Sequence, residues 1–185
     1  MYNTILIHIM SRNTSSPTMV AIQELQQKYY KMNNKNTFFK KKQKYECADL
    51  VTKQIGLDIM LKKCIYIFDN NKVYIDYTIF KTFANPNNYH DISVFLVNHI
   101  NDCIKTYKSF EIFINLDTLT ISAIERHRNV IIGFAEHGQN NGYEKYLTNM
   151  ELSNTPSFIT TTTSILNSFI SPKVTKLVKI HKKER

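Results

Sequence analysis

Hydrophobic and polar positions along the chain follow two periods, one helical and one typical of buried strands. Residues 91–107, DISVFLVNHINDCIKTY, place apolar side chains at i, i+3, i+4 and i+7 steps, which predicts an amphipathic helix facing a core. The next run, SFEIFINLD at residues 109–117, is almost continuously apolar and reads as a central strand covered on both faces. A helix followed by a buried strand predicts α/β layering.

The N-terminal third predicts two helices. MVAIQELQQKYYKM indicates a helix over about 18–32, with Pro17 in its first turn and Ser16 as its cap. The stretch NNKNTFFKKKQK breaks that helix. Residues 46–56 then predict a second short helix that ends at Gly56.

Alternating apolar runs predict strands on both sides of this helical region. Residues 3–10, NTILIHIM, form a short β-like run. Residues 59–68 and 72–80 read as two further strands, and Asp69, Asn70 and Asn71 between them suit a hairpin turn.

The C-terminal half predicts more helices and strands in alternation. Residues 118–142 read as one helix, because Ala123, His127, Val130, Ile131 and Phe134 share a face. A short helix YEKYLTN and a strand MELSNTP follow, and a last strand is expected around 175–180. The fold class that we predict is α/β, a mixed sheet of about five strands with helices packed on one side.

Between the last two predicted strands lies the segment NTPSFITTTTSILNSFISP, residues 154–172. Its apolar residues lie at 0, +7, +8 and +11, the spacing of one helical face; they are Phe158, Ile165, Leu166 and Phe169. Pro172 is expected to stop this helix. Four consecutive threonines from Thr160 give it weak intrinsic helicity, so something outside the segment must hold it.

Length and charge suggest one domain with basic ends. The 185 residues fit a single unit of ordinary size, which we divide into a basic segment 1–57 and a domain 58–185. The net charge is +7 over residues 1–63, −2 over 64–150 and +4 over 151–185. Basic ends on a near-neutral body favour docking to an anionic surface, whether membrane, nucleic acid or acidic protein.

The candidate surface-binding residues lie in those ends; they are Lys40, Lys41, Lys42, Lys44, Lys182 and Lys183. The run FFKKKQK, residues 38–44, permits three readings. In the first, its two aromatic rings enter a membrane interface while its lysines meet anionic headgroups. In the second, its lysines lie along the phosphates of a nucleic acid. In the third, it is simply a solvated loop.

Motifs for enzymatic chemistry are missing from the sequence. No GxxxxGK[ST], GxGxxG, HExxH, CxxC or GxSxG occurs, so we expect no enzyme, cofactor or metal site.

Cys47, Cys64 and Cys103 are odd in number and far apart, which favours free thiols of a reducing compartment. No apolar run reaches membrane-spanning length. We expect a cytoplasmic protein that docks peripherally on membranes. The chain is rich in Asn, Lys, Ile and Tyr, a bias typical of AT-rich genomes such as those of protists and large DNA viruses. A location in a virion therefore stays open.

An ordered series of motifs resembles the second half of a CRAL-TRIO lipid-binding domain. The strand FEIFINLDTLT ends in a turn that contains Asp117, and a long helix follows. Tyr143-Glu144 resembles that family's YPE-like short helix, Ser153-Asn154-Thr155-Pro156 its INxP-type strand, and Phe169-Ile170-Ser171-Pro172 its FLxP ending. Their order and spacing agree over about seventy residues, and the chain is similar to the compact, BCH-like members without the full N-terminal helical extension.

The resemblance implies binding, and transfer, of a hydrophobic ligand such as a phospholipid in an apolar pocket. The helix over residues 157–170 would act as its gate, which explains a weakly helical, threonine-rich segment. The ligand-binding residues that it implies are Phe158, Ile165, Leu166, Phe169 and Ile170 in the gate, Phe113 in the floor, and Lys176 near a phosphorylated headgroup. Lys173 or Lys179 replaces Lys176 if the register differs by one residue. The alternatives are a protein-binding scaffold in a larger assembly and, with less support, a nucleic-acid-associated protein.

Overall fold

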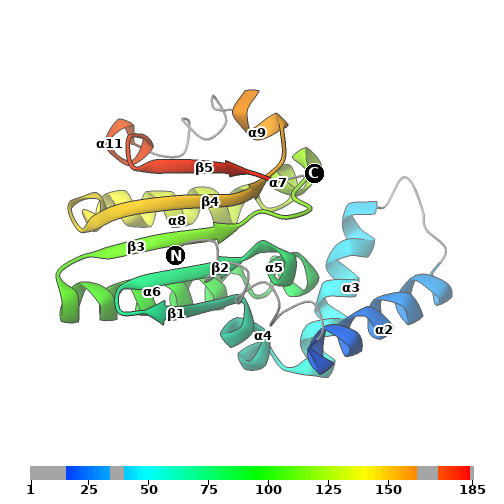
Figure 1. Cartoon of the computed structure of the whole chain (residues 1–185). Coiled ribbons are helices and arrows are strands. Elements are labelled where there is room, and N and C mark those ends of the chain that lie inside the picture. The colour runs from blue at the N-terminus through cyan, green and yellow to red at the C-terminus, as the bar shows by residue number, and fades with distance from the viewer. Residues whose placement is uncertain (1–15, 34–39, 162–170, 184–185) are drawn as a thin grey trace.

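A five-stranded mixed sheet forms the centre of the protein (Figure 1). The computed structural model describes residues 16–33, 40–161 and 171–183. The strands lie in the order β1 (Ile65–Asp69), β2 (Lys72–Asp76), β3 (Phe110–Asn115), β4 (Leu147–Thr155) and β5 (Val178–Lys182). β1 is antiparallel to β2, and every other neighbouring pair is parallel. The predicted α/β fold with a mixed sheet of five strands is confirmed.

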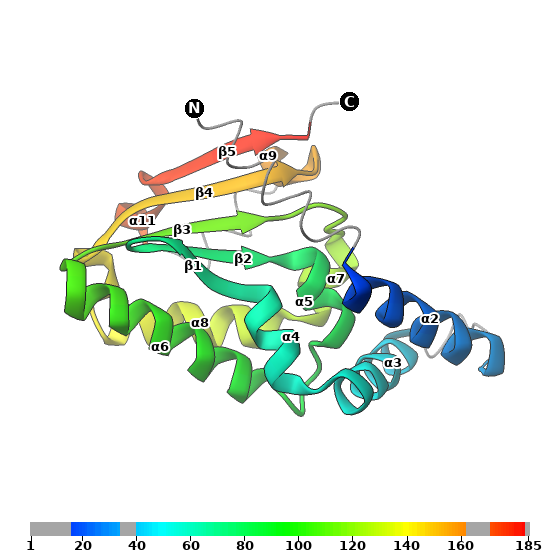
Figure 2. The ribbon, with the colours of Figure 1, turned by 60° about the horizontal axis from the view of Figure 1, so that its bottom comes forward.

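Helices connect the strands and cover the sheet. The described helices are α2 (Pro17–Met32), α3 (Lys40–Ile55), α4 (Leu57–Cys64), α5 (Tyr77–Phe83), α6 (Tyr89–Tyr107), α7 (Ile121–Arg126), α8 (Arg128–Asn140), η1 (Tyr143–Lys145), α9 (Phe158–Thr161) and α11 (Pro172–Thr175). Figure 2 shows α6 and α8 side by side beneath the same face of the sheet. The predicted helix 91–107 and strand 109–117 are thus confirmed as α6 and β3.

The N-terminal helices share the hydrophobic core with the sheet. The Ser16 side chain caps α2 by accepting from the Met19 amide, with Pro17 in the first turn as predicted. Ile22 of α2 and Val51 of α3 are fully buried in the same cluster as Phe83. The boundary at residue 57 stays a prediction, and the core is continuous across it.

Two strands are shorter than predicted, because about half of the residues predicted for each are helical. Residues 57–64 form α4, which buries Met60, Leu61 and Cys64 on one helical face while its lysines remain outside. β2 ends at Asp76, whose carboxylate accepts from the Thr78 amide at 2.8 Å and so caps α5. The hairpin itself is confirmed, since β1 and β2 pair antiparallel and Asn70 adopts a positive φ of 46° in the turn.

The predicted long helix over 118–142 is wrong in its middle. It divides into α7 and α8 at His127, where φ is −101° and ψ is 13°. His127 is only 2% exposed, and its ring packs edge-to-face against Phe80 of α5. The break lets α8 lie along the sheet while α7 stays at the end of β3.

The ends of other elements also differ from the sequence prediction. α3 begins at Lys40 and not at residue 46, so the lysines of the run FFKKKQK are helical, which contradicts the solvated-loop reading of that run. Pro172 begins α11, with the Ser171 hydroxyl as its cap. The last strand is β5, a few residues later than predicted. The predicted strand 3–10, and the stop of a gate helix before Pro172, lie outside the described residues.

Candidate functional site

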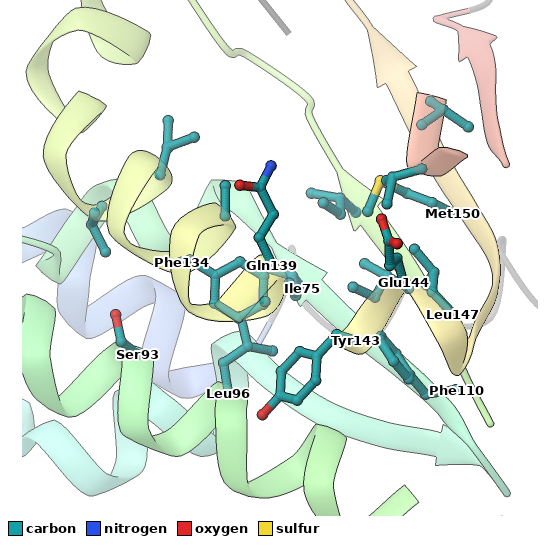
Figure 3. Close-up of a pocket in the computed structure, with 18 of the residues that line it drawn as sticks. Ile75, Ser93, Leu96, Phe110, Phe134, Gln139, Tyr143, Glu144, Leu147 and Met150 are labelled. Atoms are coloured by element: carbon teal, nitrogen blue, oxygen red, sulfur yellow. The ribbon is translucent and has the colours of Figure 1, made fainter. Parts of the chain in front are cut away.

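A cavity of about 300 Å³ lies between the sheet and the helices α6 and α8 (Figure 3). All five strands contribute to its lining, β5 through Val178 at the edge. The helices α5, α6, α8, η1 and α11 contribute the rest. Most of these side chains are aliphatic or aromatic. The cavity is therefore a property of the tertiary fold, since no short segment forms it alone.

Alternate residues of the parallel strands form its floor. Phe110, Ile112 and Ile114 of β3 point to the same side of the sheet, as the period of two requires. Across the ladder, Met150 of β4 is paired with Ile112, and Ile75 of β2 with Ile114. The register thus aligns apolar side chains of neighbouring strands into one continuous surface.

Helix α8 forms the opposite wall. Val130, Ile131, Phe134 and Ala135 line the cavity and are spaced so that they lie on one face of the helix. No residue of α8 is fully buried, whereas α6 buries four. The apolar face of α8 therefore borders the cavity and is not packed closely against the sheet.

Polar groups occur mainly at the end of the cavity formed by η1 and α11. The Tyr143 hydroxyl donates to Asn101 Oδ1 at 2.8 Å. The Glu144 carboxylate accepts from Ser171 Oγ and from Lys173 Nζ, both at 3.0 Å. These two hydrogen bonds, that from Lys173 first, lower the pKa of Glu144, so an ionised carboxylate holds the start of α11 against η1.

Most of the candidate gate residues lie outside the residues that the structure describes. Ile165, Leu166, Phe169 and Ile170 fall outside the described residues. Phe158 lies in α9 and is half-buried, and it is not part of the lining of this cavity. The gate over 157–170 therefore stays a prediction.

Phe113 and Lys176 do not lie where the sequence placed them. Phe113 lies on the face of the sheet away from α8, where its ring packs edge-to-face on Phe68 at 5.2 Å between centroids. It cannot form the floor of this cavity, since alternate β3 residues face the other way. Lys176 is an exposed residue at the end of α11 and not in a strand.

The two alternatives to Lys176 each lie near a carboxylate. Lys173 pairs with Glu144 at the cavity's polar end, as described above. Lys179 of β5 lies 3.9 Å from Glu151, which is also 3.3 Å from His181 Nε2. Glu151 shares the sheet face of Phe113, so of these three lysines only Lys173 contacts the rim of the cavity.

The candidate surface lysines occupy two places. Lys40, Lys41 and Lys42 are exposed in the first turns of α3, and Lys44 is half-buried beside them. At the other end of the chain, Lys182 is exposed, and Lys183 donates to Asp117 at 2.7 Å. Their binding to an anionic surface stays a prediction.

Within the part of the chain that the structure describes, neither a metal-ligand cluster nor a membrane-spanning helix is present. Among the described residues, no group of three or more His, Cys, Asp or Glu side chains could hold a metal ion. Within those same ranges, no helix is both long and apolar enough to cross a bilayer.

Sequence reasoning missed the role of α8. Val130, Ile131 and Phe134 were expected as an ordinary core face, and periodicity alone carried no sign that the helix borders a cavity. The Glu144–Ser171 contact was also missed, although both residues belong to motifs of the resemblance.

Comparison with known proteins supports the fold alone. No family model and no curated protein matches the chain. Among solved structures it is similar to Sfh5, a protein of the Sec14 family with a CRAL-TRIO fold, with a TM-score of 0.54 at 10% sequence identity. The match covers 85% of this chain but only 62% of Sfh5. The chain therefore has a Sec14-like arrangement of a mixed sheet and its helices.

Proposed function

We propose that the protein binds a hydrophobic ligand in the cavity beneath α8, a hydrocarbon chain of a lipid being the class that fits best. The observation that carries this proposal is the loosely packed apolar face of α8 over a cavity of about 300 Å³. Protein interiors are normally close-packed, so an open apolar space of this size needs an explanation.

The size and lining suit a small apolar ligand. Ligand pockets commonly measure about 300 to 1,000 Å³ and are lined by hydrophobic side chains with a few polar groups. An apolar cavity of about 150 Å³ already takes up benzene. The hydrogen-bonded Tyr143 and Glu144 at one end would meet a polar headgroup, while the floor around Ile112 would hold the chain.

The structural relative supports the same class of function. Sfh5 belongs to a lipid-binding family, and the described fold is similar to it. Binding is non-enzymatic in this proposal. Transfer between membranes would follow if α8 or the segment 157–170 moves to release the ligand.

The test is native mass spectrometry of protein purified under mild conditions, followed by uptake of a fluorescent fatty acid. We expect a bound hydrophobic molecule in the wild type. Ala135→Leu adds three carbons to a side chain that lines the cavity and should weaken uptake about tenfold or more, because the ligand and the new side chain compete for the same space.

The matched control is Asn129→Leu, which adds a similar apolar side chain to an exposed position of the same helix. It should leave uptake within about twofold of the wild type. If no adduct appears and neither fatty acids nor phospholipids bind, the cavity is only a packing defect, and the protein-binding scaffold becomes the better interpretation.

A further inference from the structure

Three helices meet at the end of the sheet where β2 and β3 finish. α5 follows β2 and α7 follows shortly after β3. α3 joins them through the Tyr45 hydroxyl, which donates to the carbonyl oxygen of Arg126 at 2.6 Å. Phe80 of α5 packs on His127, the residue after Arg126, with ring centroids 5.0 Å apart. In the two views of the ribbon, α5 lies between the sheet and α3 (Figures 1 and 2).

Each of the three helices contributes a half-buried cation to this junction: Lys44 from α3, Lys81 from α5 and Arg126 from α7. Arg126 Nε donates to His127 Nε2 at 3.1 Å, and Lys81 Nζ donates to Thr118 Oγ1 at 2.5 Å. Among the described residues, no carboxylate lies within 4.0 Å of any of the three charged groups.

Burial distinguishes these three cations, because most lysines and arginines of the described chain also lack a carboxylate within 4.0 Å, and the majority of those are exposed. Lys53, Lys62 and Lys72 are each within 2.8 Å of an aspartate three or four residues away. Those lysines are mostly more exposed, and an exposed ion pair adds little stability. Half-buried cations need compensation more, because burial removes part of their hydration.

The cations also act on each other. Burial lowers the pKa of Lys44, and the charges of Arg126, Lys40 and Lys81 lower it further. The same positive field reaches His127, whose pKa falls to about 3 through burial first and then through Arg126, Lys44 and Lys41.

Two carboxylates near Lys81, those of Asp117 and Asp76, oppose the effect of burial on its pKa. Both have other partners. Asp76 accepts from Thr78 and Asn115, and Asp117 accepts from Lys183. Within the described ranges, the side of the junction that carries Lys44 and Arg126 therefore has no carboxylate paired with either cation.

We propose that Lys44, Lys81 and Arg126 form a binding site for a phosphate monoester. Such a group carries about −1.5 to −2 charges and three strong acceptor oxygens at neutral pH, and Arg and Lys bind phosphate through charge-assisted hydrogen bonds. The position agrees with a general property of open α/β sheets, in which ligands bind beyond the carboxyl ends of the strands.

The phosphate could belong to a soluble molecule or to a lipid headgroup. The site is independent of the proposed function, because none of the three cations lines the cavity beneath α8. Failure of fatty-acid uptake would thus leave this site untouched, and failure of phosphate binding would leave the cavity untouched.

Titration calorimetry with inositol trisphosphate, and co-sedimentation with vesicles that contain phosphatidylinositol bisphosphate, test the site. We expect Lys44→Gln and Arg126→Gln each to raise the Kd about tenfold or more, as loss of a hydrogen bond to a charged group implies. Lys53→Gln is the matched control. It removes the same charge from the other end of α3, where the lysine pairs with Asp49, and it should change the Kd less than about twofold.

Thermal unfolding gives a readout that does not depend on a single variant. Trisphosphate at about ten times its Kd for the wild type should raise the Tm of the wild type by about 3 to 6 °C and that of Lys44→Gln by less than about 2 °C. Binding of the soluble trisphosphate as tightly as the vesicles assigns a soluble ligand, and binding of vesicles alone assigns a lipid. The proposal is overturned if neither probe binds, or if Lys53→Gln weakens binding as much as Lys44→Gln.

Discussion

At the scale of single residues, His127 shows how the neighbours of a side chain determine its charge. Its Nε2 accepts from Arg126 Nε, so its Nδ1 carries the proton of the neutral ring and lies 2.8 Å from the Tyr89 hydroxyl. The Tyr45 hydroxyl donates to the carbonyl oxygen of Arg126, the residue that precedes His127. A second proton on His127 would displace the Arg126 contact, so the ring is held neutral.

The pKa of His127, about 3 in the folded protein against about 6.5 in an unfolded chain, predicts a loss of stability in acid. Between these values the unfolded state binds the proton and the folded state does not, so the free energy of unfolding falls as pH decreases. The loss should be about 1.4 kcal/mol per pH unit once the pH is below about 6. Urea denaturation at pH 7 and pH 5 measures it.

The variant His127→Gln should be less stable at pH 7 but should lose about 2 kcal/mol less than the wild type between pH 7 and pH 5. His90→Gln, at an exposed position of α6, should keep the pH dependence of the wild type. An unchanged pH dependence in His127→Gln would show that the ring is protonated in both states or in neither.

At the scale of secondary-structure elements, α6 and α8 cover the same face of the sheet but are packed differently. α6 buries Ile92, Leu96, Ile100 and Cys103, whereas α8 has no fully buried residue. Local stability follows from buried apolar contacts. α8 is therefore the less stable of the two helices and the one whose movement would open the cavity.

Hydrogen exchange should reveal this difference. We expect the amides of α8 to exchange at least about tenfold faster than those in the middle of α6, because α8 can open without disrupting the core. Addition of a bound fatty acid should slow exchange in α8 and leave α2 unchanged, since α2 does not line the cavity. Equal exchange in α6 and α8, unaffected by ligand, would contradict both the loose packing of α8 and the proposed function.

At the scale of the whole molecule, the hydrophobic core extends from α2 to β4. Ile22 and Val51 in the N-terminal helices are buried in the same cluster as Cys103 of α6 and Leu147 of β4. A continuous core predicts cooperative unfolding of the described chain as one unit. The basic N-terminal third is thus structurally part of the domain, although its net charge differs from that of the middle.

Ile22→Ala should lower the free energy of unfolding by about 2 to 5 kcal/mol, and it should do so for the entire protein. Circular dichroism and the reactivity of the buried thiol of Cys103 should report the same lowered urea midpoint. Val20→Ala, at a position of α2 that is 49% exposed, should change the midpoint little. If Ile22→Ala shifts the dichroism of the helices but not the exposure of Cys103, the first helices form a separate unit.

The local hydrophobic pattern was sufficient to predict those helices and strands in which the pattern is long and regular. The helix over 91–107 and the strand over 109–117 were predicted within a few residues of α6 and β3. The cap at Ser16 and the end of α3 before Gly56, which adopts a φ of 97°, were also predicted. These features depend on residues close together in the chain, so the sequence contains them directly.

Short apolar runs were ambiguous for a physical reason. Residues 57–64 and 77–83 are long enough for two turns of helix or for a strand, and their apolar positions fit both periods. Asp76 caps α5 only because β2 ends there, and β2 ends where its pairing with β3 stops. The break at His127 likewise depends on Phe80 and Tyr89, which lie far from it in the sequence.

The sequence by itself determined an α/β fold, its mixed sheet, its free cysteines and the basic character of its ends, since each follows from composition or from local periodicity. It also determined that Phe110, Ile112 and Ile114 share one face of their strand and Phe113 the other. Only the tertiary structure decided which face borders α8, because that depends on where a helix from another part of the chain packs. The cavity and the junction of Lys44 with Arg126 arise in the same way, from residues that only folding brings together.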